Sequence, residues 1–168
     1  MKHELSEVIK KVKLSWDSMS IESLKEIQDL VSELSKQSIE INSDQMLNGV
    51  ELYKDNEHGF ILYAYSEQKD TYRRPHNHGR GWVVYAVVSG EIEMGNYINW
   101  IKTDEISNLM LKNSEIIRSG QAKIYYPGEI HDTRCISENA IILRLTSCDL
   151  RVEDMEGRML RFYSGMIC

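Results

Sequence analysis

Residues 72–100, which read YRRPHNHGRGWVVYAVVSGEIEMGNYINW, decide the fold. Residues 82–88 are β-branched, aromatic or small apolar and end at Ser89 and Gly90, a pattern typical of a buried strand closed by a turn. His76 and His78 precede this strand. On a β-strand, residues i and i+2 share a face and lie roughly 7 Å apart. We therefore expect the two imidazoles to project to one side, as two ligands of one divalent metal ion would.

A second stretch, residues 123–131 (KIYYPGEIH), supplies a third histidine, His131. The chain has two prolines, Pro75 and Pro127, and each lies within four residues of one of the proposed ligands His76 and His131. Proline fixes φ and removes a backbone donor, so it marks turns and the starts of strands. We expect rigid turns beside both ligands.

Composition limits the classes of protein that the chain can belong to. With 168 residues, 42% of them hydrophobic and 27% charged, it is long enough for one domain with its own core. The formal net charge of −6 argues against nucleic acid as a partner, because phosphate binding needs a basic surface.

The three cysteines favour a reduced compartment. Cys135, Cys148 and Cys168 are widely spaced, odd in number and form no C-x-x-C pair, so they predict thiols in a cytoplasmic protein rather than a disulfide framework. The N-terminus has no continuous apolar segment of a signal peptide, and no run approaches the ~20 apolar residues that cross a bilayer. We expect no membrane partner.

Helical spacing of apolar residues is confined to the N-terminal segment. Residues 4–17 carry one apolar stripe, and a second helix is predicted from Ile21 to about Lys36 with Ser20 as its N-cap. Packing against the outside of a barrel is the expected role of these helices, and a partner-binding arm is the alternative.

Beyond residue 41 the period becomes strand-like. Short apolar runs recur at the spacing of an all-β barrel or sandwich. They lie at residues 50–53, 60–65, 82–88, 91–100, 106–111, 114–117, 122–126 and 140–146. We predict a single domain over residues 1–168: a helical segment (1–40), a barrel core (about 50–147) and a covering segment (148–168), with a final strand as one possibility for the last part.

The two histidine stretches resemble the paired motifs of the cupin superfamily. The first motif, G-x5-H-x-H-x3–4-E-x6-G, is matched by His76, His78 and Gly90, with Val83 where the glutamate ligand would fall. The second, G-x5-P-x-G-x2-H-x3-N, is approximated by residues 120–135, with His131 as its histidine. This resemblance implies the double-stranded β-helix (jelly-roll) barrel of cupins, preceded here by α-helices, and a metal held by the three histidines.

Three histidines without the glutamate resemble the cysteine dioxygenase (thiol dioxygenase) branch, whose iron has three histidine ligands. The late strand of that family carries Ser-x-His-x-Tyr, and here the histidine and tyrosine positions are Arg144 and Thr146. The family's carboxylate-binding arginine falls on Asp55. The resemblance therefore implies a related oxygenase with a different substrate.

Three neutral imidazoles would leave the charge of a divalent ion uncompensated, so the site favours an anionic substrate that binds the metal directly. A facial set of ligands with open positions suits non-haem Fe(II), while nickel, zinc and manganese stay open. Arg144 is the candidate anchor for a substrate carboxylate, since a guanidinium can bind it through two hydrogen bonds. Tyr85, two residues after Val83, is expected to face inward as a core or pocket residue.

These observations favour a mononuclear Fe(II) dioxygenase acting on a small anionic molecule, with a thiol as one candidate. A non-catalytic cupin that binds a ligand or metal for sensing or storage is the first alternative. A metal-dependent isomerase or lyase that uses Tyr85 as acid or base is the second. Both a monomer and a homodimer are compatible with the sequence.

Overall fold

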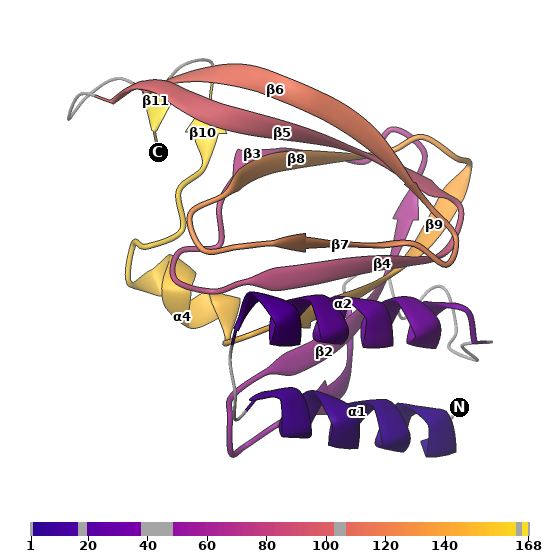
Figure 1. Cartoon of the computed structure of the whole chain (residues 1–168). Helices are drawn as coiled ribbons and strands as arrows, with labels where there is room; N and C mark the ends of the chain where they lie inside the picture. Colours follow the sequence, from indigo (N-terminus) through magenta and orange to yellow (C-terminus); the bar gives the residue numbers. More distant parts are fainter. Residues whose placement is uncertain (1, 17–19, 38–48, 103–106, 164–165, 168) are drawn as a thin grey trace.

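The computed structural model describes residues 2–16, 20–37, 49–102, 107–163 and 166–167. Two helices come first, and antiparallel strands make up most of the remainder (Figure 1). The helices are α1 (Lys2–Trp16), α2 (Ile21–Ser35) and α4 (Leu150–Met155). The strands are β1 (Val50–Lys54), β2 (Ile61–Gln68), β3 (Tyr72–His76), β4 (Val83–Ser89), β5 (Glu91–Lys102), β6 (Ser107–Arg118), β7 (Ala122–Tyr125), β8 (Ile130–Cys135), β9 (Asn139–Thr146), β10 (Phe162–Tyr163) and β11 (Met166–Ile167).

Two sheets form the barrel. The first has the strand order β1-β2-β9-β4-β7 and the second the order β3-β8-β5-β6, with antiparallel neighbours throughout. Strands distant in sequence, such as β2 and β9, are therefore neighbours in the sheet. This is the all-β, double-stranded β-helix (jelly-roll) barrel with N-terminal helices that the sequence predicted.

Alternation along β4 separates two cores. Val83, Tyr85 and Val87 belong to the cluster between the two sheets, while Val84 and Ala86 belong to the cluster beneath the helices. Because successive strand side chains point to opposite faces, a strand buried on both faces needs the unbroken apolar run seen at residues 82–88.

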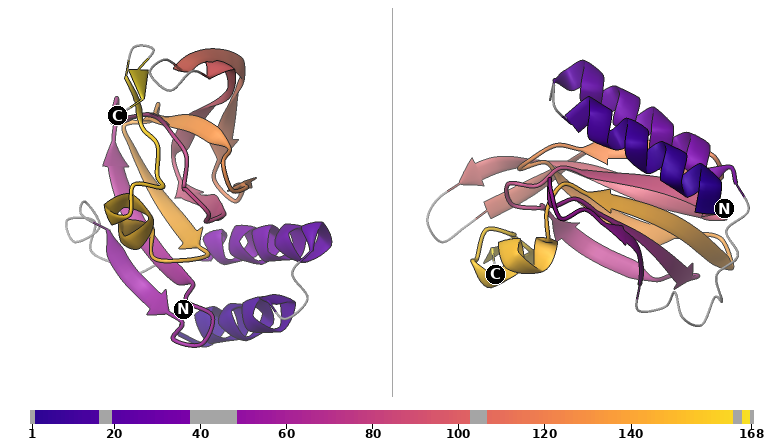
Figure 2. Two further views of the ribbon diagram at one scale, coloured as in Figure 1. Left: turned by 90° about the vertical axis from the view of Figure 1, so that its left-hand side faces the viewer. Right: turned by 90° about the horizontal axis from the view of Figure 1, so that it is seen from below.

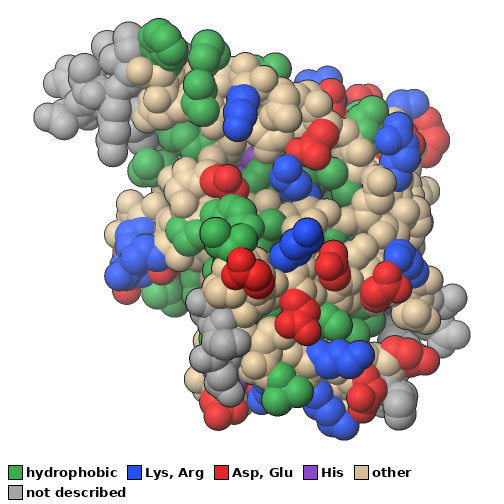
Figure 3. All heavy atoms as spheres, in the orientation of Figure 1, with side chains coloured by type: hydrophobic (Ala, Val, Ile, Leu, Met, Phe, Trp, Pro, Cys, Tyr) green, Lys and Arg blue, Asp and Glu red, His purple; other side chains and the backbone are tan. Residues whose placement is uncertain are grey.

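The helices cover the outer face of the first sheet, as expected (Figure 2). α2 begins at the predicted N-cap: the Ser20 hydroxyl accepts a hydrogen bond from the backbone N–H of Ser23 at 3.1 Å. Ile27 and Val31 of this helix are buried with Leu143 and Leu145 of β9. On the face drawn in Figure 3, acidic and basic side chains are interspersed over the helices, so α1 and α2 replace an apolar sheet surface by a charged one.

One strand prediction within the barrel was wrong. Residues 106–111 and 114–117 were expected as separate strands, but β6 continues through Lys112, at an irregularity of the ladder, and through Asn113, which pairs with Asn96 of the long strand β5. The covering segment forms the short helix α4, capped by the Asp149 carboxylate, before the two-stranded β10–β11 ladder. No helix in the described parts of the chain has the length and apolarity of a membrane span.

Candidate metal centre

His76 and His131 meet because β3 and β8 are paired. The two residues are direct partners in the ladder, next to an irregularity between Arg73 and His76. Their ring centroids are 4.6 Å apart. The proline-marked stretches thus bring two of the predicted ligands together from distant parts of the sequence.

His78 reaches the same place by a different route from the one expected. β3 ends at His76, so the two histidines do not share a strand face, and the strand argument was wrong for His78. Instead the chain turns: the backbone N–H of Asn77 donates to Leu160, and the backbone N–H of Gly81 donates to the carbonyl of His78. Gly79 has a φ of +62°, which favours glycine at this turn.

The three histidines form a compact cluster. One ring nitrogen from each lies within 4.8 Å of those of the other two. His78 and His131 are 1% and 0% exposed, and their ring centroids are 4.9 Å apart. The structure thus brings together the three histidines that the sequence singled out, in an arrangement that can hold one divalent ion.

The hydrogen bonds of the cluster fit a metal ion. Both ring nitrogens of His131 and Nδ1 of His78 are buried without a partner among the described residues. Buried polar atoms are normally paired, so the unpaired nitrogens call for a ligand, and one ion can take one nitrogen from each ring. Nδ1 of His76 lies 2.8 Å from the carbonyl of Arg74; a carbonyl only accepts, so this bond fixes the proton on Nδ1 and leaves Nε2 free to coordinate.

Electrostatics keep the imidazoles neutral. Burial lowers the pKa of His78 and of His131 well below the usual range, and the neighbouring histidines lower both further. Burial also lowers the pKa of His76, and the nearby Arg161, Arg73 and Arg144 act in the same direction. Neutral imidazole is the form that binds a metal.

Two tyrosines enclose His131. The ring of Tyr125 stacks on it at a centroid distance of 3.7 Å and an angle of 13°, and Tyr85 meets it edge-on at 5.6 Å. The Tyr85 hydroxyl lies 3.2 Å from Nε2 of His78, and burial raises the pKa of Tyr85. Tyr85 therefore faces the cluster as a protonated hydroxyl.

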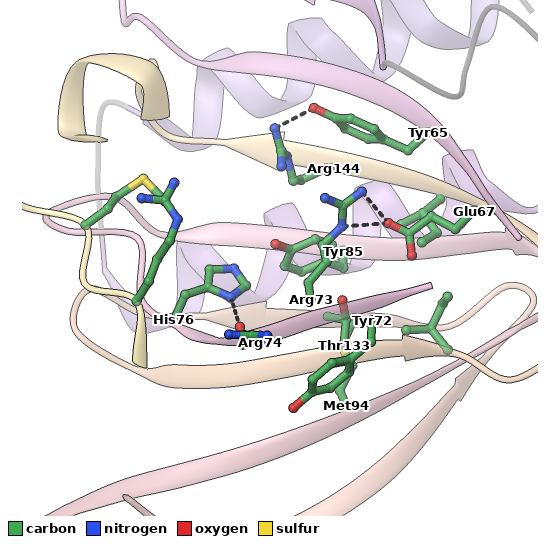
Figure 4. Close-up of a pocket in the computed structure, with 14 residues that line it drawn as sticks. Tyr65, Glu67, Tyr72, Arg73, Arg74, His76, Tyr85, Met94, Thr133 and Arg144 are labelled. Atoms are coloured by element: carbon green, nitrogen blue, oxygen red, sulfur yellow. Dashed lines mark hydrogen bonds and ion pairs between the residues drawn. The ribbon is translucent and has the colours of Figure 1, made fainter. Parts of the chain in front are cut away.

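A cavity of about 440 Å³ adjoins the cluster at His76. Its walls carry positive charge: four arginines line it against a single carboxylate. The charged lining residues are Arg73, Arg74, Arg144, Arg161 and Glu67. Tyr65 and Tyr85 lie in the same wall (Figure 4). Such a lining favours a negatively charged ligand.

Arg144, the candidate substrate anchor, lines this cavity from β9 together with Ile142. Its Nη2 donates to the Tyr65 hydroxyl at 2.6 Å, and its guanidinium lies 4.6 Å from the centroid of the Tyr65 ring. No carboxylate within the described residues forms an ion pair with it. Arg144 is thus placed where a substrate anion could meet it.

The sequence analysis missed the pair Arg73–Glu67. The Arg73 guanidinium bonds to Oε1 of Glu67 at 2.8 Å, and Glu67 is 5% exposed. A glutamate at the end of the apolar strand β2 and an arginine three residues before a proposed ligand were available signals. Neither residue belongs to the histidine motifs, so the motifs do not predict their role.

Other motif positions have structural surroundings. Val83 is fully buried in the cluster between the sheets, opposite Tyr125 in the β4–β7 ladder. Cys135 is a core thiol: it is buried in the same cluster, with its Sγ 3.4 Å from the carbonyl of Ser137. Asp55 is buried and pairs with Lys13 of α1 at 2.6 Å, far from a substrate-binding role.

No family model and no curated protein matches the chain. Among solved structures, a recombinant oxalate oxidase in complex with glycolate is 16% identical at a TM-score of 0.48, over 67% of this chain and 57% of that chain. The cupin domain of Cnp3 from Schizosaccharomyces pombe is 11% identical at 0.47, over 65% and 69%. KdgF from Halomonas sp. is 12% identical at 0.47, over 58% and 74%.

In the first two structures matched, both of oxalate oxidase, this chain spans 42% of the other chain's length. Likeness at these identities concerns the fold alone. The fold is the double-stranded β-helix that the resemblance implied, and the structures named here carry no argument for the cysteine dioxygenase branch.

Proposed function

We propose that this protein is a mononuclear non-haem Fe(II) dioxygenase of the cupin fold that acts on a small anionic substrate. The observation that carries the proposal is the convergence of His76, His78 and His131 beside a cavity lined by arginines. Three imidazoles on one ion leave positions open for a substrate and for dioxygen, which is the ligand pattern of non-haem iron oxygenases.

Each residue has a distinct task in this proposal. The three histidines hold the ion, and a bound Fe(II) would supply the redox chemistry for oxygenation. Arg144 binds and orients the anionic part of the substrate from the cavity wall. The Tyr85 hydroxyl, beside His78, can donate a hydrogen bond to a substrate atom at the metal.

Metal content is the first test. Protein purified without chelator should contain about one divalent ion per chain by elemental analysis, and His76→Ala and His131→Ala should each lose it. His58→Gln is the matched control. Among the described residues, His58 belongs with Asp55 and Glu57 to the second group that could hold a metal ion. Full metal in both alanine variants would refute the ligand assignment.

Oxygen consumption is the second test. Iron-loaded protein should consume dioxygen in the presence of one or more members of a panel of small thiols and carboxylates, and the His131→Ala variant should not. Tight binding of a panel member by the iron-loaded protein without oxygen uptake would instead assign the chain to non-catalytic, ligand-binding cupins.

A metal-dependent isomerase or lyase is the second candidate. It is favoured by the buried Tyr85 hydroxyl, 3.2 Å from a proposed ligand and within the wall of the cavity. Conversion of a substrate under argon, with loss of the reaction in Tyr85→Phe at unchanged metal content, would support this candidate over the dioxygenase.

A further inference from the structure

An ion pair with Glu67 orients the Arg73 guanidinium and leaves part of its N–H donors unpaired in the described chain. Its Nε donates a hydrogen bond to Oε1 of Glu67 at 2.8 Å, and its Nη2 forms an ion pair with the same oxygen at 2.8 Å. Nη1 has no acceptor among the described residues. The buried Glu67 therefore orients the guanidinium and leaves one edge available toward the cavity that both residues line.

Arg144 is fixed by a neutral group. The Tyr65 hydroxyl accepts its hydrogen bond, and the rings of Tyr63 and Tyr65 lie at 5.4 and 4.6 Å from the guanidinium carbon. These contacts orient Arg144 but do not compensate its charge. A partly buried guanidinium without a counter-ion is costly, so the site is completed by an anion.

The guanidinium groups of Arg73 and Arg144 belong to the same cavity. Both line the cavity that His76 and Tyr85 also line, and the close-up shows Arg73 bonded to Glu67 and Arg144 bonded to Tyr65 (Figure 4). Arg161, which also lines the cavity, is already bonded to Asp154 at 3.0 Å. Arg73 and Arg144 each keep N–H donors that no described residue accepts, and both line the cavity.

We propose that Arg73 and Arg144 form a two-armed carboxylate clamp and that the ligand is a small dianion. This proposal rests on the proposed function: one anionic group of the ligand binds the metal held by the histidines, and a carboxylate at its other end binds the clamp. A carboxylate has two oxygens and about four acceptor positions, so it can accept from two planar guanidinium groups at once. Glu67 and Tyr65 act as positioning residues.

The test is a calorimetric titration of metal-loaded protein with straight-chain dicarboxylates of two to six carbons and with monocarboxylates of equal length. The variants are Arg73→Gln and Arg144→Gln. Arg118→Gln is the matched control: Arg118 also donates through Nε to a glutamate, Oε1 of Glu91 at 3.0 Å, but it does not line the cavity.

At one chain length or more, the dicarboxylate should bind at least tenfold more tightly than its monocarboxylate, and each clamp variant should lose that preference while Arg118→Gln keeps it. Equal binding of the two ligand classes, or an equal loss in all three variants, would overturn the clamp. Elemental analysis of the same samples tests the proposed function separately: a clamp that fails in fully metal-loaded protein leaves the metal site intact as a proposal.

Glu67→Gln separates positioning from charge. It removes a negative charge from the cavity, so a purely electrostatic site would bind dianions more tightly. A clamp that depends on the orientation of Arg73 should instead bind them more weakly, and tighter binding would contradict the positioning role.

Discussion

His131 is held by aromatic rings rather than by hydrogen bonds. Metal-binding histidines usually donate their second ring nitrogen to a carboxylate or carbonyl, which fixes the ring. Here neither nitrogen of His131 has such a partner in the described chain, and the ring lies flat against Tyr125. Stacking has taken over the orienting role.

Tyr125→Leu should therefore weaken metal binding, whereas Tyr125→Phe should retain it. Loss of an orienting contact around a ligand typically costs 10–100-fold in metal affinity, and we expect a loss of at least about tenfold for the leucine variant. Titration against a competing chelator, at a temperature where all variants are folded, measures this. If phenylalanine weakens binding as much as leucine, the hydroxyl that contacts Met94 at 3.6 Å is what matters.

At the scale of elements, α2 stabilises the barrel through a few fully buried side chains. Ile27 is 0% exposed in the cluster beneath the helices, whereas Ile21 at the start of the same helix is 71% exposed. Burial of an apolar side chain stabilises in proportion to the area removed from water. The contribution of the helix should thus depend strongly on position.

Ile27→Ala should lower the free energy of unfolding by about 2–5 kcal/mol, the range for truncating a buried aliphatic side chain. Ile21→Ala, on the same helix, should change it by less than about 0.5 kcal/mol. Urea denaturation monitored by circular dichroism compares the two. Equal effects would mean that α2 is not packed on the sheet as described.

Elements with a strong local signal could be predicted from the sequence. Ser20 starts α2 because its hydroxyl caps the helix, and the run at residues 82–88 forms β4 because both of its faces are buried. The sequence predicted two strands in place of β6 because polar residues interrupt its apolar pattern. Pairing with β5 keeps the strand continuous, and no local pattern reveals that contact. α4 was missed because six residues are too few for a helical period.

The candidate site was predictable only in part, for a related reason. Spacing and proline identified His76, His78 and His131, since those signals are local. Glu67 and Arg73 lie on strands of different sheets that a short turn at residues 69–71 joins, and their pairing depends on how that turn directs the two strands. The ion pair of Asp55 could not be predicted from the sequence either, because its partner Lys13 lies in α1, far away along the chain.

At the scale of the whole molecule, burying neutral histidines couples stability to pH. Burial holds the pKa of His78 and of His131 well below the ordinary value of 6.5. Below pH 6.5 the unfolded chain takes up protons that the native imidazoles do not. The unfolded state then binds more protons than the native state, so stability rises with pH across this range.

We therefore expect the metal-free protein to be equally stable at pH 7.5 and 8, and to lose stability as the pH falls below about 6.5. Each imidazole contributes at most about 1.4 kcal/mol per pH unit. Urea midpoints at pH 7.5, 6.5 and 5.5 measure the slope, and His131→Gln should reduce it. A midpoint that increases on acidification would contradict neutral, buried histidines.

The barrel carries the candidate site and the helices cover its outer apolar surface. This arrangement has a practical consequence for experiments with shortened chains. A fragment starting at Val50 would retain every residue of the candidate site. It would also strip the cover from Phe60, Leu62, Val84 and Leu143, which are all buried beneath α1 and α2. Such a fragment should aggregate in solution, because a wide apolar sheet surface exposed to water promotes association. A failed assay on a trimmed fragment would then report on solubility rather than on chemistry.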